Sequence, residues 1–590
     1  MLNPNRTRPP KFLIELIKPS HYDDDGYVIQ WWRGFTPSNS LSTLYGLALD
    51  AGRRRILGDD VAIEINALDE STARVRTSRI IRNFRRNQNR GVVCLVGVQT
   101  NQFARAVDLA RLFIAAGIKV VIGGFHVSGC ASMLPEMPPE LKEAREMGII
   151  LFAGEGEGRF DELIRAINEG REAPSYNFLA DLPGLESQPL PYLLQGHVKR
   201  YIGTVGSFDT GRGCPFSCSF CTIINVQGHK SRYRTADDVE QLIRMGLAQG
   251  VDSYFITDDD FARNRNWEPI LDRIIKLRRE EGLKVHLILQ ADTASYKIPN
   301  FVKKAKHAGC RRVFLGLETI NPESLADASK GQNRITEYRA MLQAWRDAGV
   351  LTYAGYILGF PRDTMETIER DIRIIQRELP IDLLEFFILT PLPGSRDHQG
   401  LYLKGTPMDT DVNRYDLEHV TTDHPLMPRA EWEAAYDRAW HLYYSPEHIE
   451  TMIRRATVNG ARPARLASMI FFFYASYAIE HVHPLQGGFI RRKPRCQRRP
   501  GFPQEAAIPF FLRRTGEMVK TIGSALALRW QIERIRRRVA REGYPDAYSD
   551  KAIAPALKDY SEELEMFGTS EAARAVVARA RTKVAGNRSA

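Results

Sequence analysis

Three cysteines within eight residues constrain this chain more than any other feature of its sequence. Cys214, Cys218 and Cys221 follow the spacing C-x3-C-x2-C in a chain that has seven cysteines in all. Three thiolates can hold three irons of a [4Fe–4S] cube and leave the fourth iron open, whereas an electron-carrying cluster normally takes four thiolates. A zinc loop or a set of buried thiols is the alternative, but zinc usually binds two separated ligand pairs and no second pair lies nearby. The spacing therefore predicts a cluster in which one iron is free to bind a ligand.

Length and composition favour a multidomain globular protein of a reducing compartment. A chain of 590 residues is too long for one ordinary domain. The odd number of cysteines has no disulfide-like layout. The start of the chain, Met1–Pro10, lacks an apolar signal core, and the most apolar run, Leu466–Ile479, is shorter than the roughly 20 residues that cross a bilayer. We therefore expect a cytoplasmic protein that is either soluble or peripheral to the membrane.

The net charge of +11 is unevenly distributed along the chain. Residues 425–590 contain about 28 Lys and Arg against 17 Asp and Glu, and the rest of the chain is balanced. This imbalance indicates an acidic partner for the C-terminal part, such as anionic lipid or nucleic acid.

Short apolar runs alternate with helical stretches in residues 1–185. The expected strands are Lys11–Ile17, Val61–Ala67, Val92–Val98, Lys119–Gly123 and Ile149–Phe152. Such alternation is typical of an α/β fold with a parallel, doubly wound, Rossmann-like sheet. Ligands of these sheets bind at the carboxyl ends of the strands.

About six further strand–helix repeats follow in residues 200–405. The expected strands are Ser207–Thr210, Ser253–Thr257, Val285–Ala291, Arg312–Leu317, Leu351–Leu358 and Leu383–Leu389. Six repeats predict a partial (βα)6 barrel that is open on one side, with the cysteine loop after its first strand. Polar residues at the carboxyl ends of barrel strands are those that meet substrate.

Residues 406–590 are expected to be mostly α-helical. Trp432, Tyr436, Trp440 and Tyr444 recur every four residues, which is typical of core packing. A basic cluster after the apolar run Leu466–Ile479 is compatible with contact to an anionic membrane, or with a buried helix followed by a solvated loop. The cluster consists of Arg491, Arg492, Lys493, Arg495, Arg498 and Arg499.

The cysteine loop resembles that of the radical S-adenosylmethionine (SAM) superfamily. Arg212-Gly213 before the first cysteine and Phe220 before the last also match this family. The resemblance implies that Cys214, Cys218 and Cys221 ligate a [4Fe–4S] cluster and that SAM chelates the open iron. It also implies an external electron donor of the flavodoxin or ferredoxin type.

Glycine-rich turns upstream are similar to those of the cobalamin-binding domain that precedes the radical core in cobalamin-dependent members. The matching positions follow successive strands, and glycine allows tight turns and close approach to a corrin. They are Thr100, Asn101 and Gln102; Gly123, Gly124 and His126; and Gly154, Glu155 and Gly156. A ligand-free Rossmann domain is the alternative. No Asp-x-His-x-x-Gly motif is present, so we expect no histidine on cobalt through that motif.

Polar strand ends of the second region match the family in order and type. The resemblance suggests Asp258, Gln290, Glu318 and Tyr356 as contacts of SAM or as lining of the substrate cavity. Carboxylates accept hydrogen bonds from ribose hydroxyls and from the methionine ammonium. Each of these residues has the alternative of a satisfied structural polar group, and Asp259 and Asp260 are expected to cap the following helix.

The resemblance implies methylation of an unactivated carbon through a 5′-deoxyadenosyl radical and methylcobalamin. We expect a small-molecule substrate that is hydrophobic or membrane-associated, because an apolar run and basic residues occur together. One alternative keeps both cofactors but leads to oxidative cyclisation, rearrangement or hydroxylation. Another is an RNA-modifying radical SAM enzyme, although nucleic acid is the less favoured partner.

Overall fold

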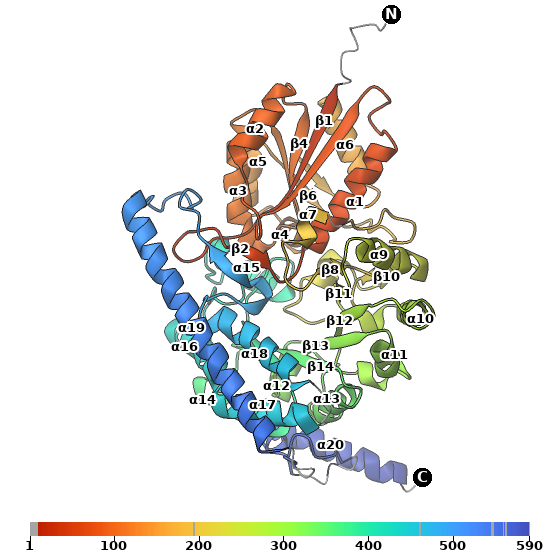
Figure 1. Cartoon of the computed structure of the whole chain (residues 1–590), viewed down its shortest axis with the longest axis vertical. Coiled ribbons are helices and arrows are strands. Elements are labelled where there is room, and N and C mark those ends of the chain that lie inside the picture. The colour runs from red at the N-terminus through yellow and green to blue at the C-terminus, as the bar shows by residue number, and fades with distance from the viewer. Residues whose placement is uncertain are drawn as a thin grey trace, which may run out of the picture.

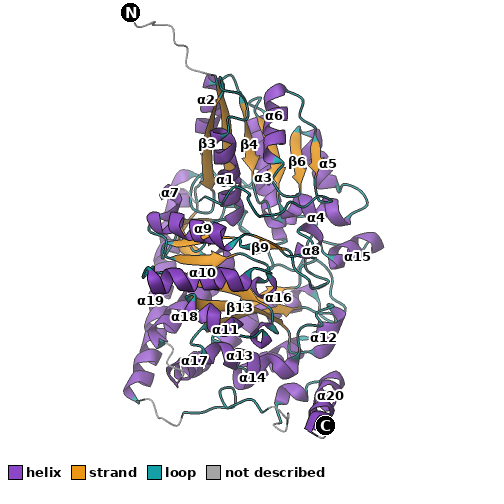
Figure 2. Ribbon diagram, turned by 90° about the vertical axis from the view of Figure 1, so that its right-hand side faces the viewer, coloured by secondary structure: helices purple, strands orange, loops and turns teal. Residues whose placement is uncertain are grey.

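The computed structural model describes residues 10–192, 195–458, 462–543, 548–557, 560 and 563–588. The first nine residues of the chain, which include most of the polar start, lie outside this range. Two parallel sheets are stacked along the long axis of the molecule, and helices of the C-terminal region lie beside the lower sheet (Figures 1 and 2).

The upper sheet has six parallel strands in the order β3-β1-β4-β5-β6-β7. Apolar side chains on its two faces form two separate cores, one under α1 and α6 and the other under α2, α3, α4 and α5. The predicted doubly wound architecture is therefore confirmed. The strands are β1 (Lys11–Lys18), β3 (Ala62–Asp69), β4 (Gly91–Leu95), β5 (Lys119–Gly123), β6 (Ile149–Ala153) and β7 (Ser175–Asn177). The helices are α1 (Asn39–Arg53), α2 (Thr77–Arg86), α3 (Thr100–Ile114), α4 (Phe125–Met133), α5 (Pro139–Glu146) and α6 (Phe160–Glu169).

The lower sheet is the predicted partial barrel. Its six parallel strands follow the order β15-β14-β13-β12-β11-β8, so each strand pairs with its neighbour in the series and β8 does not close onto β15. The strands are β8 (Val205–Phe208), β11 (Ser253–Ile256), β12 (His286–Ala291), β13 (Cys310–Glu318), β14 (Leu351–Leu358) and β15 (Leu383–Ile388). The longer helices of this region are α9 (Ala236–Ala248), α10 (Trp267–Glu280), α11 (Phe301–His307), α13 (Tyr338–Asp347), α14 (Met365–Glu378) and α15 (Arg396–Lys404). Short elements are α7 (Gln195–Val198), β9 (Gly211–Arg212), α8 (Ile223–Val226), β10 (Arg232–Tyr233) and α12 (Pro322–Asp327).

The C-terminal region is helical, as predicted. Its helices are α16 (Arg429–Tyr443), α17 (Pro446–Val458), α18 (Pro463–Ala478), α19 (Ala507–Arg541) and α20 (Glu571–Arg588). The aromatic series Trp432, Tyr436, Trp440 and Tyr444 is buried, which confirms its prediction as core. Phe386 of β15 packs edge-on against Trp440, so α16 covers the outer face of the barrel at β15.

Strand β2 (Gln30–Gly34) was not expected from the sequence. It pairs antiparallel with β16 (Gly488–Arg492), more than 450 residues later in the chain. Trp31 is buried in this pair, and Arg491 of β16 forms an ion pair with Asp23 at 2.7 Å. The two strands join the unit that contains the upper sheet to the C-terminal region.

Of the two alternatives for Leu466–Ile479, membrane contact or a buried helix, the structure favours the packed helix. This run forms α18, which packs against α17 and α19 and is half-buried rather than exposed. Phe473 of α18 contacts Tyr353 of β14. Most of the following basic cluster is neutralised inside the protein, because Arg491, Lys493, Arg498 and Arg499 pair with acidic residues. Within the ranges described, no helix combines the length and hydrophobicity that crossing a bilayer requires.

Candidate functional site

The cysteine loop lies between β9 and α8, where the two units meet. Backbone hydrogen bonds fix it at both ends: Cys214 N–H donates to the Gly228 carbonyl at 3.2 Å and Ser219 N–H to the Ala328 carbonyl at 3.0 Å. Gly213 has φ +91°, and a Cβ there would lie 2.5 Å from the Lys230 carbonyl oxygen. The turn into the first cysteine therefore requires glycine.

The three thiols of this loop suit an iron–sulfur cluster. None of them is in a disulfide. Burial raises the pKa of Cys214 to about 12 and that of Cys221 to about 11. The negative charge of Cys221 raises the pKa of Cys214 further, and the negative charge of Cys218 raises that of Cys221. The thiols are thus close enough to repel one another as anions, an arrangement that bound iron relieves. Lys330 reinforces the loop, with its ammonium 5.5 Å from the Phe220 ring and paired with Glu318.

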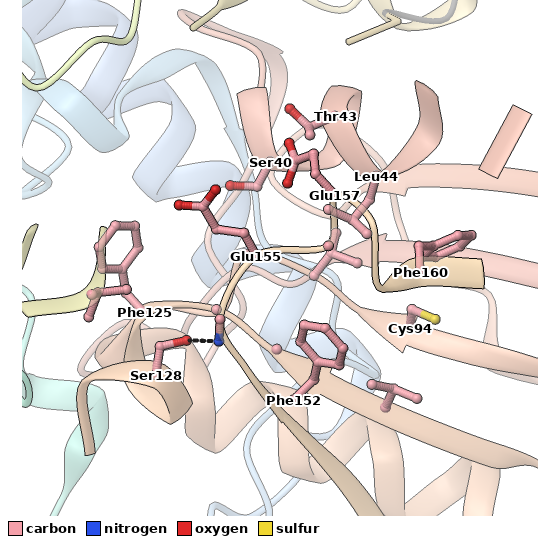
Figure 3. A pocket seen from close by; sticks show the side chains of 18 of the residues that line it. Ser40, Thr43, Leu44, Cys94, Phe125, Ser128, Phe152, Glu155, Glu157 and Phe160 are labelled. Carbon is pink, nitrogen blue, oxygen red and sulfur yellow. Dashed lines mark hydrogen bonds between the residues drawn. The ribbon is translucent and has the colours of Figure 1, made fainter. Parts of the chain in front are cut away.

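A cavity of about 170 Å³ lies at the carboxyl ends of β4, β5 and β6, as expected for this fold (Figure 3). It is lined by the predicted Gly123, Gly124, Gly154, Glu155 and Gly156, together with Asn39, Ser40, Thr43 and Leu44 of α1, which sequence reasoning missed. Gly124 has φ +146°, and a Cβ there would lie 2.1 Å from the Val98 nitrogen.

The polar lining of this cavity leaves hydrogen-bonding capacity for a ligand. Thr43 Oγ1 and Asn39 Oδ1 are buried and have no hydrogen-bond partner within the described part of the chain. Buried polar atoms are rarely left unpaired without a reason. The glycine turns and these two atoms fit a large ligand with a polar periphery, and cobalamin has that character.

A second cavity of about 180 Å³ adjoins the cysteine loop. Thr100 and Asn101 line it from the upper sheet, Thr222 and Ile223 from the segment after Cys221, and Pro393 from the loop after β15. Phe125 lines both cavities, and Val226 and Gln227 of the same segment line the first. The predicted corrin-binding turns and the cysteine loop therefore converge on one region.

A buried arginine ties the two units together at this point. Arg212 donates to Glu155 at 2.6 Å, to Glu157 at 2.7 Å and to Asp209 at 3.0 Å. Burial alone would raise the pKa of Glu157, but the charge of Arg212 outweighs it and lowers that pKa; the pKa of Asp209 is held well below its usual value in the same way, with help from Arg234. Arg232 also pairs with Glu155. Glu155 therefore lines the first cavity, but its carboxylate is already bonded to Arg212 and Arg232 and links the upper sheet to the barrel.

Two predicted cofactor residues point elsewhere. Gln102 accepts hydrogen bonds from Gln99 N–H at 3.1 Å and from Lys18, so it caps α3. His126 is fully buried on the opposite side of α4 from the first cavity, with its ring 4.4 Å from Phe103. Neither residue lines a cavity described above, because Gln102 turns back to the N-cap of α3 and His126 packs against Phe103 of α3.

The predicted SAM contacts of the barrel divide into two groups. Asp258 accepts from Thr210 N–H at 2.6 Å, Thr210 Oγ1 at 2.7 Å and Asn264 at 2.9 Å, so its carboxylate already joins β8 to β11. Gln290 donates to the Asp258 carbonyl at 3.1 Å. Asp260 caps the short helix after β11 by accepting from Ala262 N–H, as expected, whereas Asp259 accepts from Gly213 N–H and so supports the cysteine loop. These positions support the strand ends, and their contact with SAM stays a prediction.

Glu318 and Tyr356 differ in the face of the sheet that they occupy. The Glu318 carboxylate lies over the inner face, since a Cβ on Gly316 would meet it at 2.4 Å. Tyr356 is paired in register with Phe386 and packs against it on the helix-covered face, so it does not line the barrel interior. Strand side chains alternate between faces, and this alternation corrects the prediction for Tyr356.

Glu385 is an interior carboxylate that sequence reasoning missed. It neighbours Phe386 on β15 and therefore faces the inner side, opposite Gly355, which in turn is opposite Gly316. It is 1% exposed, and neither of its carboxylate oxygens has a hydrogen-bond partner in the described ranges. Burial, and then the charge of Glu318, raise the pKa of Glu385 to about 8. The sequence did contain a signal for this residue, because Glu385 is the one charged residue within the otherwise apolar strand β15.

Comparison with known proteins identifies the central region. Residues 209–375 match the radical SAM superfamily model, which confirms the resemblance predicted from the cysteine loop. The chain is 25% identical to the hopanoid C-2 methylase of Rhodopseudomonas palustris over 60% of this chain and 68% of that protein. It is 26% identical to the bacteriochlorophyllide d C-8(2)-methyltransferase of Chlorobaculum tepidum over 55% of this chain and 72% of that protein.

The fold is similar to a solved structure. The radical S-adenosylmethionine methyltransferase TsrM from Kitasatospora setae, determined with cobalamin and a [4Fe–4S] cluster bound, superimposes with a TM-score of 0.55 at 17% identity. The similarity covers 74% of this chain and 90% of TsrM.

We predict that Arg212→Gln destabilises the protein at pH 7 by about 3–5 kcal/mol, because it leaves three buried carboxylates without their shared cation. Thermal unfolding followed by circular dichroism measures the effect. Arg54→Gln is the matched control, since Arg54 pairs with Asp50 and Asp161 at the surface, where such pairs contribute about 1 kcal/mol or less. Equal effects of the two substitutions would contradict the buried linkage.

We predict that Glu385→Gln removes a pH dependence of stability between about pH 5 and pH 8. The raised pKa means that the folded state holds a proton that the unfolded state releases, so wild-type stability is present at low pH and declines as pH rises through about 8. The variant should match wild type at pH 5 and exceed it at pH 8 by an amount on the order of 3 kcal/mol. Denaturant unfolding at both pH values, with the exposed Glu143→Gln as control, tests this; an unchanged slope for Glu385→Gln would refute it.

Proposed function

The chain belongs to the radical SAM superfamily, and we propose that it is a cobalamin-dependent radical SAM methyltransferase acting on an unactivated carbon. A Rossmann-like sheet precedes the partial barrel in the chain, which is the domain order of the cobalamin-dependent members. When bound, the cluster with SAM would supply a hydrogen-abstracting radical and cobalamin a transferable methyl group. We place the cobalamin site on residues 1–185, the radical site on residues 200–405 and an accessory region on residues 406–590.

One observation carries this proposal: both cavities of the upper sheet open against the segment that follows Cys221. A methyl donor and a radical source must reach the same substrate carbon, so their sites must share a space. Arg212 holds the Gly154–Glu157 turn against the cysteine loop. Cys214, Cys218 and Cys221 would hold the cluster, while Gly124, Gly154 and Thr43 would border the corrin ligand.

We further propose that the substrate is hydrophobic. The two relatives named above are a hopanoid methylase and a bacteriochlorophyllide methyltransferase, and both names denote acceptors with large apolar ring systems. In this chain, aromatic side chains occupy the inner face of the barrel and its cover. They include Phe314, Tyr353, Phe387 and Phe473. An acceptor that approaches this face of the barrel would meet aromatic rings, which favours an apolar one.

A peripheral membrane contact through α19 would bring such a substrate to the enzyme. This helix extends along one edge of the molecule (Figure 1). Large apolar side chains on its outer face are exposed, and their spacing follows the helical repeat over about 33 Å. They are Ile508, Phe511, Leu512, Met518, Val519, Ile522, Leu526 and Trp530. We call this set the α19 stripe.

Charge favours an anionic bilayer as the partner of the α19 stripe. Between Ala507 and Trp530 the helix has four basic residues and one acidic residue, Glu517. Glu517 pairs with Arg513 and Arg514 on the inner side, whereas Lys520 is exposed. Apolar side chains flanked by cations are typical of helices that lie in the membrane interface.

Methyl transfer can be tested with SAM labelled at its methyl group. The reconstituted enzyme, reduced by a flavodoxin or ferredoxin system, is incubated anaerobically with a total lipid extract. We expect 5′-deoxyadenosine and a labelled lipid in the mass spectrum, both absent in Cys218→Ala, which lacks one cluster ligand. Formation of 5′-deoxyadenosine with unlabelled products would instead favour cyclisation, rearrangement or hydroxylation.

Membrane contact can be tested by flotation with phosphatidylglycerol-containing vesicles. Leu512→Ser/Val519→Ser/Leu526→Ser should lower the bound fraction by about tenfold or more, since each substitution removes apolar area that the bilayer would bury. The matched control is Leu112→Ser/Leu403→Ser/Leu426→Ser, which changes exposed but scattered leucines. Dimerisation that the stripe variant abolishes, without flotation of wild type, would assign the stripe to a second copy of the chain.

A further inference from the structure

A third and larger cavity lies on the edge of the upper sheet, away from the two cavities described above. It encloses about 720 Å³ between β3, the start of α2, β2 and β16. This volume is within the range of small-molecule sites. We call it the basic cleft, because seven of its lining residues are cations: Arg33, Arg74, Arg76, Arg79, Lys199, Arg200 and Arg492.

The charge of the basic cleft is not balanced by the protein. In the described portion of the chain, none of the seven cations forms an ion pair; Arg74 donates to the sulfur of Cys496, and Arg33 lies 5.0 Å from the Trp32 ring. Elsewhere arginines are paired, as Arg54, Arg105 and Arg212 are. The one carboxyl that lines the cleft, Glu15, has its pKa raised to about 7, chiefly by burial and against the charge of Arg79, so it is only partly ionised at neutral pH and cannot balance seven cations.

The cations come from four separate parts of the sequence. Arg33 is on β2, Arg74 and Arg76 connect β3 to α2, and Arg79 is in the first turn of α2. Lys199 and Arg200 precede β8, and Arg492 is on β16. Folding therefore gathers like charges that the unfolded chain keeps apart, and this gathering costs Coulomb energy unless an anion compensates it. The start of α2 adds a further preference for an anion, because Arg76 at its N-cap makes no side-chain cap.

An exposed aromatic pair borders the basic cleft. Trp32, which lines the cleft, lies 6.1 Å from Phe489 of β16, and Ile490 follows Phe489. All three side chains are more than two-fifths exposed. A ligand with its charged group among the arginines would find an apolar surface directly beside them.

We propose that the basic cleft binds a multiply charged phosphate group, presented either by a free phosphorylated molecule or by the headgroup of a lipid whose apolar part rests on Trp32 and Phe489. Guanidinium groups bind phosphate oxygens in pairs, which matches a cleft built mainly from arginine. The site is separate from the cluster and corrin cavities, so the proposal does not depend on the methyl-transfer function.

Isothermal titration of the full-length protein with inorganic pyrophosphate tests the proposal. We expect saturable binding that weakens as NaCl is added. Arg76→Glu/Arg79→Glu should weaken it by about tenfold or more, because two contacts become repulsive. These variants should fold, since both residues are exposed and acidic residues are favourable at the start of a helix.

The matched control is Arg265→Glu/Lys303→Glu, which makes the same charge change at exposed positions of the barrel region. Wild-type affinity in this control supports the cleft as the site, while an equal loss would show an effect of net charge and overturn the proposal. Absence of saturable pyrophosphate binding would also overturn it, as would binding of a structured RNA that pyrophosphate does not displace.

Competition distinguishes the two sources of phosphate. Vesicles of phosphatidic acid in phosphatidylcholine that displace pyrophosphate, when phosphatidylcholine alone does not, would assign the cleft to a lipid headgroup. If pyrophosphate stays bound in their presence, the ligand is a free phosphorylated molecule. The α19 stripe variant is a further control in this assay. We expect it to bind pyrophosphate like wild type, because its substitutions lie outside the basic cleft.

Discussion

The buried ion network around Arg212 is the constraint on which the arrangement of this protein depends. The guanidinium of Arg212, which lies two residues before the first cysteine, bridges Glu155 and Glu157 of the upper sheet to Asp209 of the barrel. Removing charges from water is costly, and the network is tolerable because each carboxylate accepts a direct hydrogen bond from the same cation. The glycine turns and the cysteine loop are consequently held at a fixed separation, which a reaction shared between two cofactors requires.

An open barrel needs a cover, and residues distant in sequence supply it. Phe387 on the edge strand β15 stacks on His483, and Phe473 of α18 meets Tyr353 of β14. The pairing of β2 with β16 brings the segment before α1 to the same region. The apolar run of α18 is therefore used inside the protein, and the exposed α19 stripe and the basic cleft are left as the surfaces available to partners. Both lie beside β16, since Arg514 of α19 donates to the Arg491 carbonyl and Arg492 lines the cleft.

Much of the site could be predicted from local patterns. The cysteine spacing, the glycines after β5 and β6 and the order of the strands were sufficient to predict the cluster loop, the first cavity and the partial barrel. Errors arose where a residue type was correct but its direction was not. Tyr356 and Glu385 lie on neighbouring strands at adjacent levels, yet the alternation of faces directs Tyr356 into the helical layer and Glu385 into the interior. Gln102 and His126 sit in predicted turns, but helix geometry directs both away from the cavity.

The sequence by itself determined the cofactor chemistry and the two successive α/β units, because metal-ligand spacing and hydrophobic periodicity are local properties of a chain. Only the tertiary structure decided which charges are neutralised. Arg491 and Arg499 of the basic cluster find Asp23 and Asp411, whereas Arg33, Arg76 and Arg492 find no acid in the described residues and meet in a cleft. Electrostatic energy depends on distance in space, and residues separated by hundreds of positions acquire that distance only when the chain folds.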